Sequence, residues 1–301
     1  MNKALRIILL VLAIATVVGQ VRAQLLEERL RQYGISYGKG YTSPIGDAFG
    51  ASLNSGWYHT ADVSDGLDLY IGVKAMLLPI PDDARTFTFA SPVNGVLQSL
   101  PTLFGDKTEV PISGAPGTIT PNKYAKGFDL KWAPMGVPHI SVGNVFGTRV
   151  MLRFLPKLKV SDLGDYSFFG IGVQHSISRW VRAIPLDVAG LVAYQSMSLS
   201  DIVTAKAFTI GVQASKKFAI LTIYGGAMYE SSTLSFSYTA AYQNPVPPNQ
   251  PITTPVSFDL SGKNSVRFTA GFSLSLAIIK LNADYSFASQ PVATAGIGIG
   301  I

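Results

Sequence analysis

The feature that most constrains the fold is a two-residue alternation of apolar and polar side chains, in a chain with no helix-length apolar run after Val18. Mean hydropathy is +0.29 and only 14% of the residues are charged, whereas a transmembrane helix needs about 20 consecutive apolar residues. In residues 66–79, every second side chain from Leu67 to Leu77 is apolar. Such alternation is typical of strands with one face in lipid and the other in water. The chain is therefore predicted to be all-β.

The alternation also predicts which charged side chains face inward. In residues 140–154, apolar side chains alternate with Arg149 and Arg153, and an arginine facing lipid at the midplane costs about 2–4 kcal/mol. We therefore expect both arginines in a polar lumen. Both signs of charge are expected there, which favours an internally bridged lumen over a strongly ion-selective pore. The candidate lumen or ligand-path residues are Asp68, Lys74, Arg149, Arg153 and Arg267.

These strands must close on themselves, because only helices and closed barrels satisfy every backbone group in lipid. We expect one domain, an antiparallel transmembrane β-barrel of about 12–14 strands with an even total, its first strand at residues 49–61 and its last at 292–301. Ile301 stands where many such barrels end on an aromatic residue. The Pro- and Gly-rich segments 91–122 and 241–255 suit outer loops. The alternative, a soluble β-sandwich, would carry more Lys and Glu on its outer faces.

The N-terminus has the features of a targeting segment. Residues 1–23 follow the charged, apolar and small-residue order of a cleaved signal peptide. A membrane anchor is the alternative, but the run from Ile7 to Val18 is shorter than the roughly 18 residues needed to span a bilayer. Cleavage would lower the net charge from +6 to +3, so the basic pI does not indicate nucleic acid. Residues 24–301 would form the outer-membrane barrel, with 24–48 as an N-terminal plug or rim segment.

Within that segment, residues 24–33 have the apolar spacing of a short amphipathic helix. A helix before the first strand could plug the lumen, lie on the periplasmic rim or form a frayed tail. The pattern favours the plug or the rim.

Composition excludes several kinds of chemistry. The chain has no cysteine, which rules out disulfides, thiolate metal sites and cysteine nucleophiles. Its three histidines are scattered, and its glycine-rich stretches lack the Lys and Ser/Thr of a phosphate loop. A basic patch with interleaved aromatic residues is missing as well. We therefore expect no metal, no cofactor and no nucleic acid partner.

One short motif contains residue types that could form a catalytic pair. His139 and Ser141 lie two residues apart, so they share one side of a strand. Such an H-x-S pairing occurs in outer-membrane lipid A deacylases, in which the histidine activates the serine. No Asp or Glu is indicated as the third member here, and parity places the pair in the lumen with Arg149 and Arg153, away from membrane lipid. We expect no catalytic residue and no enzymatic activity.

A resemblance to a known family adds to the interpretation of the chain as a barrel. The motif SLNSGWYHTA at residues 52–61, with LPTLFGDK, GNVFGTRVMLRFLP and FFGIGVQHSISRW further on, resembles a family of uncharacterised outer-membrane proteins from Bacteroidota and related bacteria. The similarity covers nearly the whole mature chain. Members of that family look like relatives of the long-chain fatty-acid transporter barrels, in which an N-terminal segment plugs a 14-stranded barrel and hydrophobic ligands leave sideways through the wall. The resemblance supports fold and location more than activity.

The aromatic residues of the motif have two interpretations. Trp57 and Tyr58 could join an aromatic girdle at the membrane interface, which is the interpretation favoured by their residue type. Asn54, Trp57 and Tyr58 could instead form a plug contact or a ligand gate.

Three functions remain open from the sequence. The first is passive uptake of a small hydrophobic or amphipathic molecule through a plugged barrel in the cell outer membrane. The second is a non-transporting barrel that supports a surface complex, and the third is a lipid-modifying enzyme. The expected partners are outer-membrane lipid, a small hydrophobic ligand and, during biogenesis, periplasmic chaperones and the barrel-assembly machinery.

Overall fold

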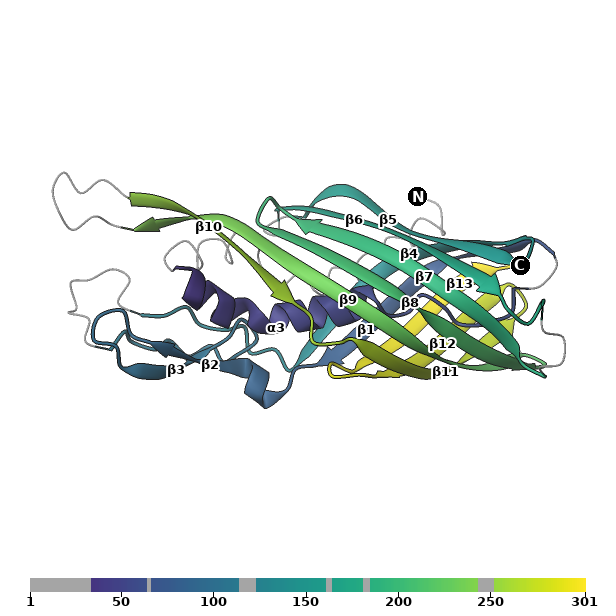
Figure 1. Ribbon diagram of the computed structural model, residues 1–301, viewed down its shortest axis with the longest axis horizontal. Coiled ribbons are helices and arrows are strands. Elements are labelled where there is room, and N and C mark those ends of the chain that lie inside the picture. Colours follow the sequence, from purple (N-terminus) through teal and green to yellow (C-terminus); the bar gives the residue numbers. More distant parts are fainter. Residues whose placement is uncertain (1–33, 64–65, 114–122, 161–163, 181–184, 243–251) are drawn as a thin grey trace.

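The computed structural model describes residues 34–63, 66–113, 123–160, 164–180, 185–242 and 252–301. The expected signal peptide, 1–23, and the expected helix at 24–33 lie outside these residues. In the described part, ten antiparallel strands close into a barrel (Figure 1), because β9 pairs with both β8 and β11 and β1 pairs with β13. Around the ring the strands are β9 (Leu221–Tyr242), β11 (Val266–Leu276), β12 (Ile279–Phe287), β13 (Val292–Gly300), β1 (Asp68–Pro79), β4 (Trp132–Val145), β5 (Thr148–Val160), β6 (Gly164–Ser176), β7 (Asp187–Leu199) and β8 (Val203–Phe218).

The predicted antiparallel barrel is confirmed, but the ring is smaller than the 12–14 strands expected. The described residues contain 13 strands, and three of them lie outside the ring: β2 (Thr86–Ala90), β3 (Leu97–Pro101) and β10 (Ile252–Ser261). The long strand β9 explains part of the difference, since its first half pairs with β11 and its second half with β10. Alternation alone cannot show which strand pairs with which, because the two-residue period of a strand's side chains is the same whatever its partner.

The two ends of the barrel differ. At the end that we call the short-turn end, two-residue turns join β4 to β5, β8 to β9 and β11 to β12, and the C-terminus lies beside them, at the right of Figure 1. At the opposite end the chain continues into an elongated extension, built from the β2–β3 hairpin, the 3-10 helix η2 (Asp82–Arg85), the outer part of β9 with β10, and the helix α3 (Ile35–Leu53). The described parts of both segments expected as long loops, residues 91–113 and residues 241–242 with 252–255, belong to this end.

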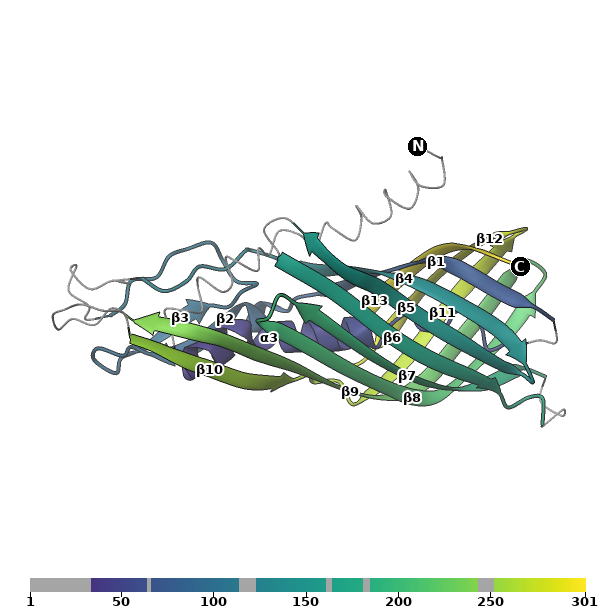
Figure 2. The same cartoon turned by 90° about the horizontal axis from the view of Figure 1, so that it is seen from above.

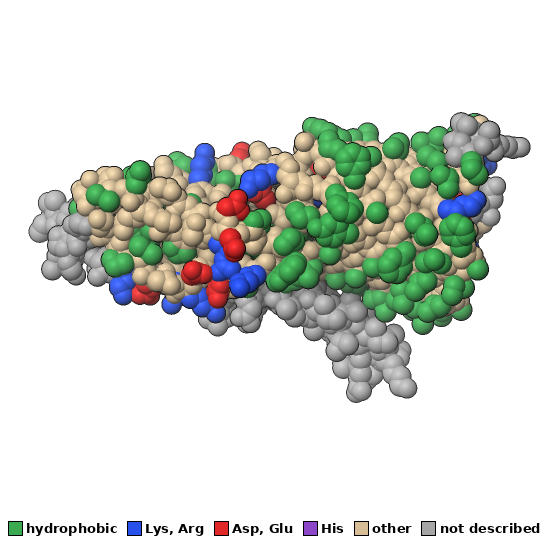
Figure 3. Space-filling model, turned by 90° about the horizontal axis from the view of Figure 1, so that it is seen from below, with side chains coloured by type: hydrophobic (Ala, Val, Ile, Leu, Met, Phe, Trp, Pro, Cys, Tyr) green, Lys and Arg blue, Asp and Glu red, His purple; other side chains and the backbone are tan. Residues whose placement is uncertain are grey.

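The outer surface of the barrel carries a continuous apolar belt. Figure 3 shows hydrophobic side chains covering the barrel half of the molecule, while charged side chains of both signs lie where the barrel meets the extension. The belt confirms the alternation, since residues between its members point inward and are buried. Its exposed side chains include Ile71, Leu77, Ile140, Val142, Val150, Leu152, Phe154, Phe169, Ile171, Val192, Ile210, Val212, Ile223, Phe268, Phe272 and Ile297.

The expected N-terminal helical segment is confirmed as α3, but it extends to Leu53, so the strand expected at residues 49–61 was wrong. The chain is helical to Leu53 and continues without regular structure through residue 61. Glycines let this helix lie close against β9 and β10, because a methyl group at Gly50 would collide with the Ser232 side chain. Pro44 lies inside the helix and has no N–H, and the Ser43 hydroxyl donates at 3.0 Å to the Gly40 carbonyl left without that donor.

Among the described residues, the structure contains no helix that is both long enough and apolar enough to cross a bilayer.

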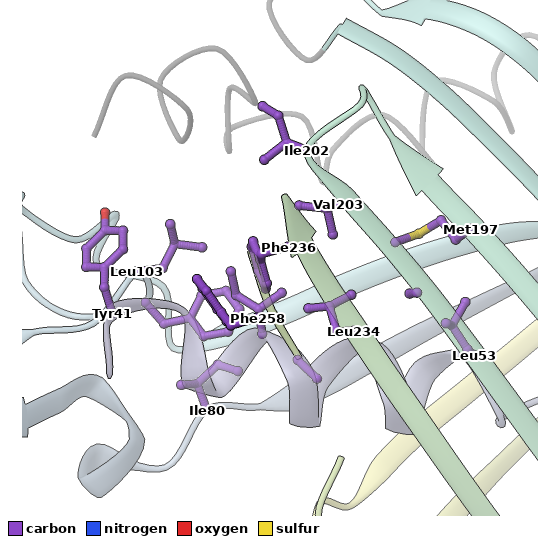
Figure 4. Close-up of a cluster of buried hydrophobic side chains, with 14 of the residues drawn as sticks. Tyr41, Leu53, Ile80, Leu103, Met197, Ile202, Val203, Leu234, Phe236 and Phe258 are labelled. Carbon is purple, nitrogen blue, oxygen red and sulfur yellow. The ribbon is translucent and has the colours of Figure 1, made fainter. Parts of the chain in front are cut away.

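The interior near the extension is an apolar core. The helix α3 lies beside β9 and β10 (Figure 2), and its side chains meet those of the barrel strands and of β10 there (Figure 4). The core continues into the barrel down to the level of Leu53, the last helical residue. We call this set the apolar core; its members include Tyr41, Leu53, Leu103, Met135, Val137, Phe168, Met197, Val203, Leu234, Phe236 and Phe258.

An ion cluster holds together distant parts of the long connection between β1 and β4. Arg85 donates to Asp106 at 2.7 Å and to Asp129 at 2.5 Å. The hydrogen bond to Asp129, with that to Asp106, raises the pKa of the Arg85 guanidinium above its ordinary value. The cation therefore stays charged and holds two parts of the connection together.

Candidate functional site

Between the apolar core and the short-turn end, the chain itself fills the barrel. Residues 54–61, which we call the luminal segment, run through the lumen from the end of α3 toward the short-turn end. Asn54, Trp57 and Tyr58 are all buried, and Trp57 is only 1% exposed. The interpretation of Trp57 and Tyr58 as an interface girdle is therefore wrong. It failed because residue type alone does not distinguish an aromatic side chain at a membrane surface from one inside a lumen.

Arg153 holds the start of the luminal segment. Its guanidinium donates to the Ser55 carbonyl at 2.8 Å, and it lies 3.9 Å from the centre of the Trp57 ring. The indole has room because Gly170 and Gly172 face it, and a methyl group on Gly172 would lie 3.0 Å from the ring. The glycines of β6 therefore serve as space for an aromatic plug residue.

Arg267 makes a second clamp on the opposite wall. It binds both carboxylate oxygens of Glu230, at 2.6 Å and 3.0 Å, and both side chains are at most 2% exposed. The same guanidinium donates to the Ala51 carbonyl at 2.8 Å and to the Ser55 hydroxyl. One buried ion pair thus joins β9, β11 and the end of α3.

Arg149 closes the lumen near the short-turn end. It pairs with Asp68 and donates to the Asp62 carbonyl at 2.9 Å and to the Gln174 side chain at 2.7 Å. Gln174 in turn donates to the Thr60 carbonyl at 2.7 Å. These contacts hold the exit of the luminal segment as firmly as Arg153 and Arg267 hold its entry.

The remaining candidate, Lys74, also lies inside. It is fully buried, and its ammonium donates to Asn282 at 2.5 Å. Nearby, Tyr224 donates to Asp284 at 2.8 Å. The structure thus places all five expected lumen residues inside the barrel, where Arg149 pairs with Asp68, Arg153 and Arg267 contact the luminal segment, and Lys74 contacts Asn282.

A small cavity lies in the lumen at the level of Tyr58. Tyr58, Arg267, Asp284 and neighbouring residues enclose a cavity of about 10 Å³, about the size required by one water molecule. Two polar atoms at this cavity, the Tyr58 hydroxyl and Asp284 Oδ1, have no hydrogen-bond partner among the described residues, and a bound water would supply one. At this level the barrel holds a plug with room for little more than water.

The H-x-S motif lies in the same interior. His139 and Ser141 are 1% and 2% exposed. His139 Nδ1 accepts a hydrogen bond from Arg153 at 3.2 Å, whereas the Ser141 hydroxyl has no partner within the described part of the chain. An arginine thus occupies the position at which a triad would need a carboxylate.

The barrel wall contains an unpaired seam beside the apolar core. β4 pairs with β1 along its length, from Trp132 opposite Pro79 to Gly143 opposite Asp68. Its pairing with β5 covers only Ile140–Val145 against Thr148–Leu152. Among the described residues, 132–139 of β4 therefore have no strand partner on that side. We call this break between residues 132–139 and 153–160 the wall seam.

The wall seam lies at the depth of the apolar belt. Pro134 of β4 is opposite Leu77 of β1, and Leu77 is a belt residue with 41% exposure. Unpaired backbone is costly at this depth. The sequence reduces that cost, because Pro134 and Pro138 in β4 and Pro156 in β5 have no N–H to leave unsatisfied.

Comparison with known proteins places the chain in a family. A model described as "Family of unknown function (DUF6588)" matches residues 1–301. The chain belongs to this family. No curated protein matches it.

Solved structures similar to this DUF6588 chain are outer-membrane proteins. Ail, the attachment invasion locus protein of Yersinia pestis, is 10% identical, with 79% of this chain and 98% of Ail covered and a TM-score of 0.28. OmpT of Vibrio cholerae is 11% identical, with 79% and 100% covered and a TM-score of 0.24. The channel DcaP of Acinetobacter baumannii is 11% identical, with 80% and 99% covered and a TM-score of 0.19. The barrel assignment itself rests on the strand pairing described above.

Sequence reasoning missed two parts of this DUF6588 site. Gln174 and Gln195 are buried lumen residues that contact the luminal segment or Arg153, and their inward parity was the available signal. The wall seam was missed as well, although the prolines at 134, 138 and 156 marked it. A proline in a central strand removes a ladder hydrogen bond, so three in two adjacent strands signal incomplete pairing.

Proposed function

We propose that this DUF6588 barrel lies in the cell outer membrane after cleavage of residues 1–23, and passes a small hydrophobic or amphipathic molecule sideways through the wall seam into the bilayer. The observation that carries this proposal is the seam itself: backbone left unpaired at belt depth, next to the apolar core. A barrel with a purely structural role gains nothing from that cost.

The route avoids the polar lumen. Arg149, Arg153 and Arg267 fasten the luminal segment, so passage along the barrel axis would require breaking buried charge-assisted hydrogen bonds. On the inner side of the seam, by contrast, Met135 and Val137 belong to the apolar core. An apolar molecule can exchange with these side chains without desolvating a charge.

The direction of transfer follows from the two ends of the molecule. Short turns suit the periplasmic side of a barrel and long connections the outer side, so we assign the extension to the outside. The molecule would enter through the apolar core of the extension and leave between β4 and β5. The sideways exit agrees with the fatty-acid transporter barrels, of which the members of the uncharacterised family that the sequence resembles look like distant relatives.

The partners follow from this assignment. Outer-membrane lipid receives the molecule, and periplasmic chaperones with the barrel-assembly machinery insert the chain. The proposal contains no catalytic step, no metal or other cofactor and no nucleic acid.

A covalent bridge across the wall seam tests the proposal. The native chain has no cysteine, so Pro138→Cys with Phe154→Cys creates a unique pair that a short bis-maleimide can join. Uptake of a fluorescent fatty acid by cells should fall to that of cells lacking the protein after crosslinking, and should be normal before it.

A second pair on the same two strands is the matched control. Val142 and Val150 are opposite each other in the paired part of β4 and β5, so crosslinking Val142→Cys to Val150→Cys should leave uptake unchanged. If the seam crosslink also leaves uptake unchanged, the transport proposal is wrong and a supporting role in a surface complex becomes the better explanation.

A further inference from the structure

The short-turn end is apolar at positions where turns are usually polar. Phe146 in the β4–β5 turn is 81% exposed, and Ile220 and Ile278 in the other two-residue turns are 56% and 54% exposed. Trp180, after β6, is 73% exposed. These tips extend the belt beyond the ends of the strands. A turn in bulk water gains nothing from such side chains.

The backbone of these turns strengthens the argument. Phe146, Ala219 and Ala277 adopt positive φ angles of 54°, 52° and 52°, in the left-handed region where Gly, Asn and Asp are favoured. The chain thus accepts strained apolar residues at positions where polar turn residues would fit better. An apolar environment around the turns accounts for both observations.

Trp180 is held in place at this end. Its indole Nε1 donates to His175 Nε2 at 3.2 Å, and His175 Nδ1 is 2.9 Å from the Thr148 hydroxyl. Histidine therefore accepts from the tryptophan on one nitrogen and can donate to the threonine from the other. An exposed indole with a fixed polar edge suits a membrane interface, where one side of the ring is in lipid and the other is wet.

The charges beside the apolar tips are basic. Arg179, Lys216 and Lys217 are exposed, and Lys216 is fixed by donating to the Pro185 carbonyl at 2.6 Å. The carboxylates described here, Asp62, Asp68 and Asp187, are only partly exposed, and Asp68 is paired with Arg149. At the other border of the belt, by contrast, charged side chains of both signs are interspersed (Figure 3). Lys157 of β5 and Asp165 of β6, for example, form an ion pair.

We infer that the short-turn end is a binding surface for anionic phospholipid, with the turn tips inserted into the leaflet and the basic side chains on its phosphates. Three features support this occupant over a protein partner. The surface is continuous with the lipid-facing belt, its tips extend that belt, and within the described residues its fully exposed charged side chains, Arg179, Lys216 and Lys217, are all basic. Basic side chains at a membrane surface attract anionic lipids.

Fluorophore labelling tests the insertion. Ile220→Cys and Ile278→Cys, each a single cysteine, can carry an environment-sensitive fluorophore on the full chain in vesicles of phosphatidylcholine and phosphatidylglycerol. Both labels should be quenched by lipids brominated near the headgroup and shielded from aqueous iodide. Val93→Cys is the control, since Val93 is an exposed apolar residue of the extension and its label should be open to iodide. Open access of iodide to labels 220 and 278 would overturn the insertion.

The lipid class is tested separately. Native mass spectrometry of the purified barrel should show phosphatidylglycerol retained in preference to phosphatidylcholine, and Lys216→Gln with Lys217→Gln should remove the preference. Lys107→Gln with Lys123→Gln in the extension is the control, and it should retain the preference. Equal retention of the two lipids by the native chain, or an unchanged preference in the Lys216 and Lys217 variant, would overturn the assignment to anionic lipid.

Discussion

The polar lumen and the apolar core fill one barrel by opposite means. In the lumen, a few arginines hold the luminal segment through directional hydrogen bonds, and Arg267 alone contacts Glu230, Ala51 and Ser55. In the apolar core, the side chains of Leu53, Phe236 and their neighbours pack by apolar contact. Removing one partner from the lumen leaves a buried charge without its partner, whereas the apolar core can exchange one apolar contact for another. The proposed function rests on this difference, because it requires a lumen sealed along the barrel axis and an apolar core open to a ligand at the side.

The largest effect is expected from breaking the lumen clamp. Arg267→Ala leaves Glu230 buried without its cation and removes the contacts to the end of α3, which should destabilise the barrel by about 3–5 kcal/mol. Urea unfolding in lipid vesicles, followed by the heat-dependent shift in gel mobility, would measure the loss.

A paired variant separates charge from packing. Arg267→Met combined with Glu230→Leu removes both charges and keeps most of the volume, so it should be clearly more stable than Arg267→Ala. Equal losses in the two variants would mean that packing, and not the buried ion pair, holds this wall of the lumen.

The sequence predicted polarity well and contacts poorly. Period two placed Lys74, Arg149, Arg153 and Arg267 inside because a misplaced arginine is costly in lipid. It could not show that Arg153 would stack on Trp57, because the two are far apart in the chain and their meeting depends on the path of the luminal segment. The same limit applies to α3, whose Gly-rich face becomes an advantage only once β9 and β10 provide a surface to approach.

In the apolar core, the expected effect comes from crowding. Gly50→Leu places a side chain where Ser232 lies and should destabilise the protein by about 1–3 kcal/mol. Lys39→Leu on the exposed side of the same helix is the control and should change stability by less than about 0.5 kcal/mol. A tolerated Gly50→Leu would show that α3 can move away from β9, which would sharpen the contrast between a yielding apolar core and a fixed polar lumen.

A smaller effect is expected at the boundary between the two regions. Trp57 donates to the Leu53 carbonyl at 3.2 Å, so Trp57→Phe loses that hydrogen bond and part of the stacking on Arg153, at a cost of about 1 kcal/mol. Trp132→Phe, on a side chain that is 54% exposed, should cost less. The same unfolding assay would show whether the indole belongs energetically to the lumen.

The smallest effect is expected from Ser141→Ala. The Ser141 hydroxyl is buried without a partner among the described residues, and removal of an unsatisfied buried polar group is nearly neutral or stabilising. Because His139 faces Arg153 and no carboxylate orients it, the same substitution should also leave the acylation of lipid A unchanged when cells with and without the variant are compared by mass spectrometry. A changed lipid A profile would assign an enzymatic reaction to the lumen. The function would then belong to the polar lumen and not to the wall seam.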